Sequence, residues 1–219
     1  MKLLILMYSK FKLIDSCREN LIKYTIKAFS IIPKMDYPYI LDIGCGTGVP
    51  TLALMDICDG YFTALDSDKS SLLWLQEKAN RMKYNERIEI INASVYDEIK
   101  LKNKFDVILA EGLLNVIGFE SGLNILLNKI KKGGYIIIHD ELKDDAKKRK
   151  IFENNKLLLL DSFVLNNDVW WNEYFYPLEK KIEESKEQEI FKKEIKEIDE
   201  YRNNPELFQS IYYVLKFNR

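Results

Sequence analysis

A glycine-rich segment near the start of the chain constrains its fold more than any other feature. The segment reads Tyr39-Ile40-Leu41-Asp42-Ile43-Gly44-Cys45-Gly46-Thr47-Gly48-Val49-Pro50. Glycines at three alternate positions allow a sharp backbone turn that passes close to a ligand. Pro50 suits the first turn of a helix, where its missing N–H group has no partner to lose. The segment therefore predicts a strand, a turn and a helix arranged around a bound nucleoside.

Strands and helices alternate after this turn. Apolar runs predict strands at residues 39–43, 61–65, 88–91, 105–110 and 135–139, with helices at 70–83 and about 119–130 between them. Two further strands are expected around 157–165 and 211–217, separated by a charged and aromatic helical stretch. The pattern predicts an α/β, doubly wound, mostly parallel seven-stranded sheet with helices on both faces and a helical, aromatic insertion before the last strand.

We expect one domain over residues 1–219. An N-terminal helical segment covers 1–38, a ligand-binding core covers 39–142, and C-terminal strands with a helical insertion at 166–205 cover 143–219. The apolar spacing before residue 33 is interrupted at Asp15, which leaves two short helices or one helix with a frayed start as alternatives. Glycine after Lys132 predicts the end of the helix before the fifth strand.

Composition narrows the class of protein and its surroundings. The 33 Lys and Arg residues nearly balance the 34 Asp and Glu residues, so no overall field attracts nucleic acid or acidic membranes. The three cysteines show neither a disulfide framework nor metal-ligand spacing, which favours a reducing cytoplasm and no bound metal. The opening apolar run, residues 3–7, is too short for a signal peptide or a membrane span. The composition does not indicate an oligomeric state.

The carboxyl ends of the predicted strands locate the candidate site. In a doubly wound sheet, ligands bind outside these ends, where the order of the strands reverses. The residues that follow the strands are 44–48, Asp66, 92–94, 111–115 and 139–141. The chemistry of the site is therefore expected among these five groups.

The spacing of the glycines distinguishes between two kinds of nucleoside. A dinucleotide fingerprint needs its third glycine three places after the second, where this chain has Val49. The stretch Leu41-Asp42-Ile43-Gly44-Cys45-Gly46-Thr47-Gly48 instead resembles the first motif of the class I S-adenosylmethionine-dependent methyltransferases. The resemblance covers about residues 40–139 and implies a Rossmann-like fold, S-adenosylmethionine as cofactor, and cofactor contacts from Asp42, Gly44, Cys45 and Gly46.

An acidic residue at the end of the second strand agrees with this resemblance. Asp66, followed by Ser67, stands where the family places the carboxylate that binds the ribose hydroxyls, and both residues are expected at the cofactor. The competing interpretation is that Asp66 caps the next helix. Ser67 or Asp68 can provide that cap instead, which favours the ribose role for Asp66.

The residues that read the adenine are less closely matched to the family. Family members often carry an acid after the third strand, and this chain has Ser94 at that position, after Ala93. Ser94 and the backbone around Ala93 are the expected adenine contacts, and Asp97 is the alternative hydrogen-bond acceptor.

Two residues are candidates for the chemistry of transfer. Methyl transfer from a sulfonium is an in-line displacement, which positioning alone can accelerate greatly. A hydroxyl or ammonium acceptor also needs a base. Glu111 after the fourth strand and His139 after the fifth are the candidate catalytic residues, and Glu111 is also a candidate for the cofactor's ammonium group. The competing interpretations are a helix-capping acid and a structural histidine.

Four further residues are candidates for binding the methyl acceptor: Asn115, Asp140, Trp170 and Tyr174. The aromatic residues can roof a pocket, although packing of the insertion onto the sheet explains most of that cluster. Residues 110–120 resemble an uncharacterised branch of the methyltransferases and lack the Asn/Asp-Pro-Pro-aromatic motif of enzymes that act on adenine or glutamine amino groups. Polyamine synthases with the same fold use a different glycine loop but carry a catalytic acid after the fourth strand, so Glu111 keeps this class as an alternative.

These observations predict methyl transfer to a small-molecule acceptor, without a nucleic-acid or membrane partner. Two alternatives remain. The chain can bind S-adenosylmethionine without catalysis, as a regulatory protein, or it can methylate protein or RNA. Near-neutral charge and the lack of an added recognition domain place the macromolecular alternative last.

Overall fold

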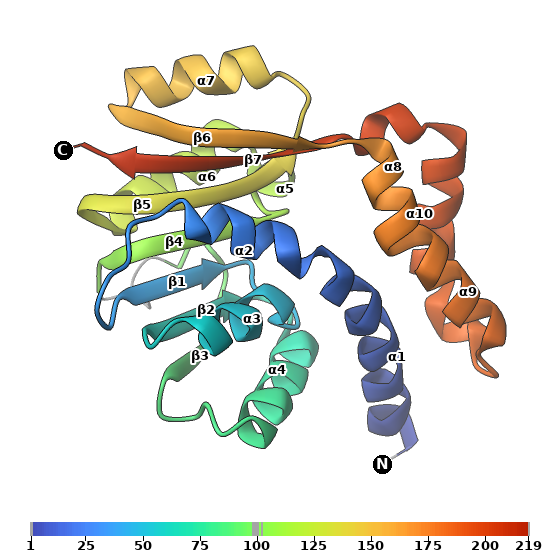
Figure 1. Ribbon diagram of the computed structural model, residues 1–219. Coiled ribbons are helices and arrows are strands. Elements are labelled where there is room, and N and C mark those ends of the chain that lie inside the picture. Colours follow the sequence, from blue (N-terminus) through green and yellow to red (C-terminus); the bar gives the residue numbers. More distant parts are fainter. Residues whose placement is uncertain (1, 98–100, 102, 219) are drawn as a thin grey trace.

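The computed structural model describes residues 2–97, 101 and 103–218, and its framework is a seven-stranded sheet (Figure 1). The strands are β1 Tyr39–Ile43, β2 Tyr61–Asp66, β3 Ile88–Asn92, β4 Phe105–Glu111, β5 Ile130–Glu141, β6 Leu157–Leu165 and β7 Ser210–Phe217. Their order is β3-β2-β1-β4-β5-β7-β6, and β7 runs antiparallel to both of its neighbours. The predicted doubly wound, mostly parallel sheet of seven strands is confirmed.

The strand order places a crevice beside the glycine-rich turn. The chain builds β1, β2 and β3 outward in one direction and then returns to add β4 on the other side of β1. At such a reversal the loops after neighbouring strands leave in opposite directions, so a ligand can enter between them. The turn after β1 and the loop after β4 lie on the two sides of this point.

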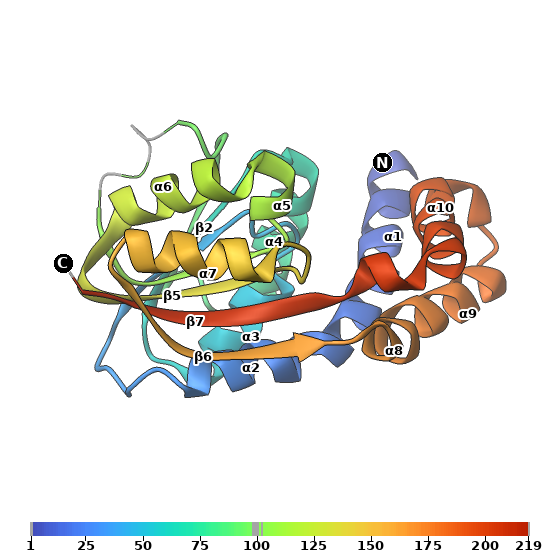
Figure 2. The same ribbon diagram turned by 90° about the horizontal axis from the view of Figure 1, so that it is seen from above.

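Helices cover both faces of the sheet (Figure 2). One face packs against α2 Ile22–Ser30, α3 Val49–Ile57 and α4 Lys69–Arg81. The other face packs against α5 Leu114–Ile117, α6 Phe119–Lys129 and α7 Asp145–Asn154. Strand residues alternate between the two faces, so the central strands are apolar almost throughout.

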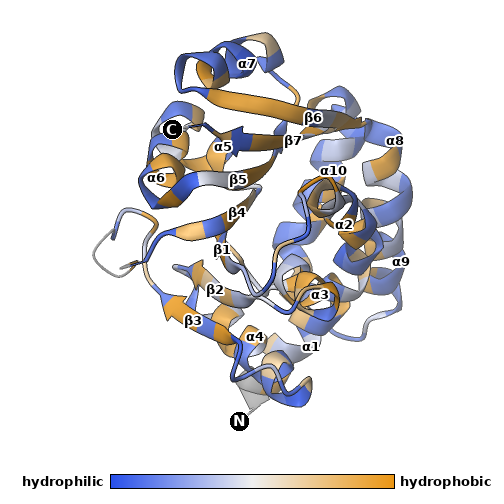
Figure 3. Cartoon of the chain, turned by 60° about the vertical axis from the view of Figure 1, so that its left-hand side comes forward, coloured by the Kyte–Doolittle hydropathy of each residue, from blue (hydrophilic) through white to orange (hydrophobic). Residues whose placement is uncertain are grey.

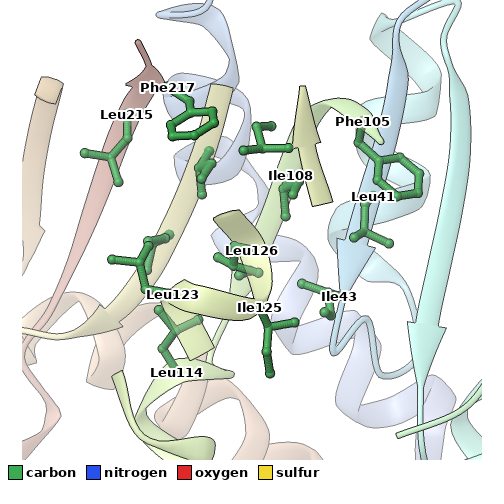
Figure 4. Close-up of a cluster of buried hydrophobic side chains, with 14 of the residues drawn as sticks. Leu41, Ile43, Phe105, Ile108, Leu114, Leu123, Ile125, Leu126, Leu215 and Phe217 are labelled. Carbon is green, nitrogen blue, oxygen red and sulfur yellow. The ribbon is translucent and has the colours of Figure 1, made fainter. Parts of the chain in front are cut away.

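Two apolar cores therefore hold the sheet between its helices. Figure 4 shows the core on the α5–α7 face, where Leu114, Leu123 and Leu126 project onto strand residues such as Ile108. On the opposite face, Leu52 and Leu75 belong to the second cluster. Hydrophobic colour follows the strands in Figure 3, whereas α7 is mostly hydrophilic. No helix in the described part of the chain is long and apolar enough to cross a membrane.

The chain between β6 and β7 forms a helical C-terminal cap, which we define as residues 167–208. It consists of α8 Asn167–Trp170, a π-helical turn Trp171–Phe175, α9 Tyr176–Glu184, a 3₁₀ turn Gln188–Phe191, α10 Lys192–Asn203 and a 3₁₀ turn Pro205–Phe208. The cap lies with α1 Lys2–Arg18 beyond the carboxyl ends of the parallel strands (Figures 1 and 2). A third apolar cluster joins the two, with Ile14 and Cys17 of α1 among cap residues such as Leu178.

The N-terminal segment forms two helices, which is one of the two alternatives drawn from the sequence, but the break is not at Asp15. Helix α1 continues through Asp15 to Arg18, and the break falls later, at a 3₁₀ turn over Glu19–Leu21 before α2. Asp15 does not interrupt the helix because its side chain is 3% exposed and hydrogen-bonded to other elements. A polar residue in the apolar pattern therefore marks a buried contact here.

The glycines after Lys132 do not cap a helix, contrary to the sequence-based prediction. Helix α6 ends at Lys129, and Gly133 and Gly134 lie within β5. Gly133 has φ +76°, and the pairing of β4 with β5 shifts register between Phe105 and Val107. The two glycines therefore belong to an irregular start of the strand.

Candidate functional site

The glycine-rich turn is anchored to the strand beside it. The backbone N–H groups of Gly44 and Cys45 donate to Leu65 O over 2.8 and 3.1 Å. Gly48 N donates back to Cys45 O at 2.8 Å, which closes the turn. Gly48 has φ +74°, and a β-carbon there would lie 2.4 Å from Leu75 of α4. Helix packing and backbone conformation therefore both require glycine at this position.

Asp66 lies against this turn at the end of β2. Its Oδ2 accepts from Gly46 N at 2.8 Å, and its Oδ1 accepts from Asp68 N at 2.8 Å. Asp68, rather than Asp66, caps α4 by accepting from Ser70 N at 2.9 Å. Each carboxylate oxygen has two lone pairs, so both can accept a further hydrogen bond from a ligand. Ser67 is exposed between the two acids.

Asp42 supports the turn from beneath rather than from the crevice. Its carboxylate is 3% exposed and accepts a hydrogen bond from the Thr51 hydroxyl of α3. Burial raises the pKa of Asp42 to about 7, against the lowering effect of the Thr51 hydrogen bond. The contact joins β1 to the first turn of α3, on either side of the glycine turn.

The loop after β3 is placed beside Asp66 by its backbone. Ala93 is buried, and its N–H group donates to Asp66 O at 3.0 Å. Ser94 N donates to Asp97 Oδ2 and Ser94 Oγ accepts from Tyr96 N, each over 3.3 Å. Ser94 and Asp97 thus belong to the same small turn, and both sequence-derived candidates for the adenine contact lie at the edge of the crevice.

Glu111 projects from the end of β4 into a cluster of hydroxyl groups. Its Oε1 accepts from Thr25 Oγ1 of α2 at 2.8 Å and from the Tyr212 hydroxyl of β7 at 3.1 Å. Within the described residues, Oε2 has no hydrogen-bond partner. Burial raises the pKa of Glu111 to about 7, with Asp42 adding to the rise and the Thr25 and Tyr212 hydrogen bonds opposing it. A carboxyl group with this pKa can take up or release a proton near neutral pH.

Thr25 is a site residue that the sequence analysis missed. It is 1% exposed and lies on α2. In the sequence it is 86 residues away from Glu111. The weak signal in the sequence is one polar residue among the apolar positions of an amphipathic helix. Tyr212 is a second such residue: the sequence places it in the last predicted strand but does not indicate its contact with Glu111.

His139 is buried in a stack of aromatic rings. The imidazole lies 4.1 Å from the Tyr212 ring and 5.8 Å from the Trp170 ring, nearly parallel to both. Its Nε2 lies 2.8 Å from Ser210 Oγ, which also accepts from Trp170 Nε1 at 3.0 Å. Burial lowers the pKa of His139 to about 3, so the ring is neutral at neutral pH and a weak base. This environment favours a structural role for His139 over proton removal.

We predict that His139 does not titrate between pH 5 and pH 8. Since it is the only histidine in the sequence, its ring-proton resonances can be followed by NMR without assignment. The resonances should move only well below pH 5, because ionisation would place a charge among buried rings. The same signals in urea should titrate near the ordinary pKa of about 6.5. A native midpoint near that value would contradict the burial argument.

A cavity of about 600 Å³ opens beside this stack, between the ends of β4 and β5 and the C-terminal cap. Asn115, Asp140 and Trp170 line it, together with Glu141 and Glu200. Asn115 Nδ2 donates to Glu141 Oε1 at 3.4 Å, which joins the loop after β4 to the end of β5. The lining residues are, in full, Gly112, Asn115, His139, Asp140, Glu141, Trp170, Glu200, Asn204, Leu207, Phe208, Gln209 and Ser210.

Two of the four candidate acceptor residues are held by other parts of the protein. Asp140 Oδ2 forms a buried ion pair with Lys148 Nζ of α7 at 2.8 Å, while Asp140 Oδ1 is buried without a hydrogen-bond partner in the described structure. Tyr174 does not line the cavity. It is 6% exposed and packs edge-on against Trp170 in the apolar cluster of the cap.

The glycine turn and the cavity are neighbours. A β-carbon at Gly44 would lie 3.1 Å from the Leu113 side chain, so the turn after β1 touches the loop after β4. Gly112 and Asn115 of that same loop line the cavity. The structure thus brings together, at one edge of the sheet, a turn suited to a nucleoside and a cavity with the volume of a small-molecule site.

A family model described as a methyltransferase domain matches residues 38–216. Among curated proteins, ribosomal protein L11 methyltransferase of Campylobacter concisus is 30% identical over 126 residues, which are 52% of this chain and 41% of that protein. Ribosomal RNA small subunit methyltransferase G of Thermoanaerobacter pseudethanolicus is 30% identical over 128 residues, 54% of this chain and 51% of that protein. The chain spans about half the length, or less, of these relatives.

Solved structures share the fold at low sequence identity. A SAM-dependent methyltransferase from Geobacter sulfurreducens in complex with S-adenosyl-L-homocysteine has a TM-score of 0.69 at 14% identity, covering 88% of this chain and 90% of that one. Coclaurine N-methyltransferase, bound to N-methylheliamine and S-adenosylhomocysteine, has a TM-score of 0.68 at 16% identity, covering 89% and 72%. The cyclase SpnF has a TM-score of 0.75 at 13% identity, covering 89% and 80%.

Proposed function

Because the chain belongs to the methyltransferase domain family, we propose that it transfers a methyl group from S-adenosylmethionine to a small-molecule acceptor. One observation carries the proposal: the Asp66 carboxylate lies 2.8 Å from Gly46 N, so the acid that we assign to the ribose lies directly against the glycine turn. The cavity beside this surface has room for a small acceptor. The proposal includes a single methyltransferase domain over residues 1–219, with the C-terminal cap over the acceptor.

The position of each candidate residue along the carboxyl-end edge of the sheet decides whether we assign it to the cofactor or to the acceptor. Asp66 would accept hydrogen bonds from the ribose, and Ala93 and Ser94 at the next loop would contact the adenine. Gly44, Cys45 and Gly46 would lie against the methionine portion, with Asp42 holding the turn from beneath. Asn115, Asp140 and Trp170, which line the cavity, would face the acceptor.

Glu111 is the residue best suited to proton transfer in this arrangement. It directly precedes Gly112, which lines the cavity, although Glu111 is not itself among the lining residues. Its Oε2 is unpartnered within the described structure, and its pKa is raised by burial to about 7. In-line transfer to an amine or hydroxyl releases a proton, which the Glu111 carboxylate could accept. Alternatively, the carboxylate would pair with the ammonium group of the cofactor.

The names of the two curated relatives favour a second candidate, a protein or RNA acceptor. The lack of basic side chains in the cavity argues against RNA. Its described lining contains neither lysine nor arginine. Of its three acids, Asp140 pairs with Lys148 and Glu200 with Lys196, which leaves Glu141 without an ion pair in the described structure. Proteins that bind nucleic acid rely on basic side chains for contacts with phosphates. A small acceptor without a phosphate therefore fits this cavity better.

Calorimetric titration of the protein with S-adenosylhomocysteine tests the cofactor assignment. We expect saturable binding of one ligand per chain, because the turn, Asp66 and the loop after β3 are already in place. Lack of binding at millimolar ligand would contradict the proposed function. The protein would then be incubated with S-adenosylmethionine carrying a labelled methyl group, together with separate small-molecule and macromolecular fractions of a cell extract. Label in a small molecule other than S-adenosylmethionine, absent without the protein, supports the proposal. Label in protein or RNA favours the second candidate, and binding without transfer indicates a silent cofactor-binding protein.

A further inference from the structure

Asp15 of α1 is a buried carboxylate that joins three parts of the fold. Its Oδ1 accepts from Thr47 Oγ1 in the glycine turn at 2.6 Å. Its Oδ2 accepts from Trp74 Nε1 and Lys78 Nζ of α4 at 2.8 and 2.7 Å. The residue is 3% exposed, so these three donors replace the water that a carboxylate would otherwise bind.

Thr47 is the residue of the glycine turn whose side chain is hydrogen-bonded to α1. It lies between Gly46 and Gly48, which have φ of +51° and +74° and no side chains of their own. Glycine makes the turn possible but also leaves its backbone able to adopt many conformations. Backbone hydrogen bonds to Leu65 and Asp66 hold one side of the turn. The buried Thr47 side chain adds an anchor on α1 through its hydrogen bond to Asp15, which further restricts these conformations.

Helix α1 lies between this turn and the C-terminal cap. Ile14 and Cys17, which flank the Asp15 face, belong to the apolar cluster of the cap. Lys10 also forms an ion pair with Glu194 of α10, at 2.9 Å. The helix is therefore fastened to the cap by apolar packing and an ion pair, and to the glycine turn by Asp15.

A buried ion pair adds little net stability, because two charges must leave water to form it. Leucine or alanine at position 15 would extend the apolar surface of α1 without burying a charge. The carboxylate instead meets a hydroxyl, an indole N–H and an ammonium group in fixed directions. These directional hydrogen bonds fix the position of α1 relative to the glycine turn and α4.

We infer that Asp15 is a positioning residue for cofactor binding, which acts through Thr47 to hold the glycine turn in its binding conformation. The inference rests on the proposed function, because it concerns the same cofactor. The inference makes the N-terminal helix part of the cofactor site, because Asp15 contacts the glycine turn and would not need to touch the cofactor. The Asp15–Thr47 contact between α1 and the glycine turn, and binding of the cofactor, should then favour each other.

Substitution of Thr47 separates this role from a general loss of stability. Thr47→Val keeps the shape of the side chain and removes only the hydroxyl, whereas Thr47→Ser keeps the hydroxyl. Calorimetric titration with S-adenosylhomocysteine, well below the unfolding temperature, should show a roughly threefold to tenfold weaker affinity for Thr47→Val. Thr47→Ser should bind within about twofold of the unmodified protein. A structural role alone would lower the unfolding temperature without changing the affinity of the folded protein.

Glu194→Gln is the matched control. It removes the ion pair between α1 and the cap but does not touch the turn, so the affinity for S-adenosylhomocysteine should be unchanged. The double variant Asp15→Ala/Thr47→Val should bind no more weakly than Asp15→Ala alone, because both changes break the same contact. Equal affinities of Thr47→Val and the unmodified protein, or an equal loss in Glu194→Gln, would overturn the inference. Failure of the unmodified protein itself to bind would contradict the proposed function, and the role of Asp15 with it.

Discussion

Asp66→Ala is expected to weaken the binding of S-adenosylhomocysteine by about 10- to 100-fold. A hydrogen bond to a charged group contributes roughly 1.5–3 kcal/mol, and each 1.4 kcal/mol corresponds to a factor of about ten in affinity. The alanine variant loses the acceptors proposed for the ribose. It also removes the acceptors of the backbone N–H groups of Gly46 and Asp68, which can then donate hydrogen bonds to water. Isothermal titration calorimetry measures the change directly.

Asp106→Ala is the matched control for this prediction. Asp106 also lies on a strand of the sheet, but near the amino end of β4, where it pairs with Lys131 at 2.8 Å. Its replacement removes a carboxylate of the same type without changing the crevice, so affinity for the ligand should not change. Far-ultraviolet circular dichroism and thermal unfolding confirm that both variants fold. An Asp66→Ala protein that is folded and binds the ligand normally would show the ribose assignment to be wrong.

Glu111→Gln is expected to stabilise the ligand-free protein at pH 8 by about 3 kcal/mol. The pKa of Glu111 is about 7 in the folded protein and near 4.5 when exposed, as in the unfolded chain. Between pH 4.5 and about pH 7 the folded state binds this proton more tightly than the unfolded chain does. The free energy of unfolding therefore falls as the pH rises through this range. Above pH 7 the full penalty of a buried charge is present, and the shift of about 2.5 pKa units corresponds to roughly 3 kcal/mol. Glutamine has no charge to bury.

The gain should therefore depend on pH in a defined direction. It should be largest above pH 7 and shrink towards zero as the pH approaches 4.5, where both states of the unmodified protein carry the proton. Glutamine can still accept the hydrogen bonds of Thr25 and Tyr212 through its amide oxygen. Urea unfolding of both proteins from pH 5 to pH 8 measures the difference.

Glu120→Gln provides the control for this series. Glu120 is an exposed acid in the first turn of α6, so its replacement should leave the pH dependence unchanged. Asp42 also has a pKa raised by burial to about 7, and its charge adds to the rise at Glu111. The difference between the Glu111→Gln protein and the unmodified protein therefore reports Glu111 together with its coupling to Asp42. A Glu111→Gln protein that is less stable than the unmodified protein at pH 8 would contradict the assigned pKa.

A carboxylate that destabilises the folded protein near neutral pH is a feature of functional sites. A structural role at this position is served equally well by glutamine, which keeps the acceptor oxygen for Thr25 and Tyr212. The raised pKa of Glu111, its unpartnered oxygen in the described structure and its place at the end of β4 instead suit contact with the cofactor or proton transfer.

The fold could be predicted from the sequence because local signals agreed along the chain. Strand and helix periods alternated from residue 39 onward, and glycine at Gly44, Gly46 and Gly48 marked the first turn. Parallel strands place their carboxyl ends on one edge, so the loops that carry Asp66 and Glu111 could be assigned to one site before any distance was known. The sequence offered Ser67 or Asp68 as the cap of α4 in place of Asp66, and the structure shows that Asp68 provides it.

Only the tertiary structure decided which side chains from distant segments meet at that edge. Asp15, Thr25 and Tyr212 lie on α1, α2 and β7, and nothing in their local sequence indicates that two of them hold Glu111 and the third holds the glycine turn. The same applies to His139, whose position after β5 suggested a base. Burial against Tyr212 and Trp170 leaves it neutral. The reason is physical: backbone periodicity is a local property, whereas the pKa and partners of a side chain depend on burial and on elements far away in the chain.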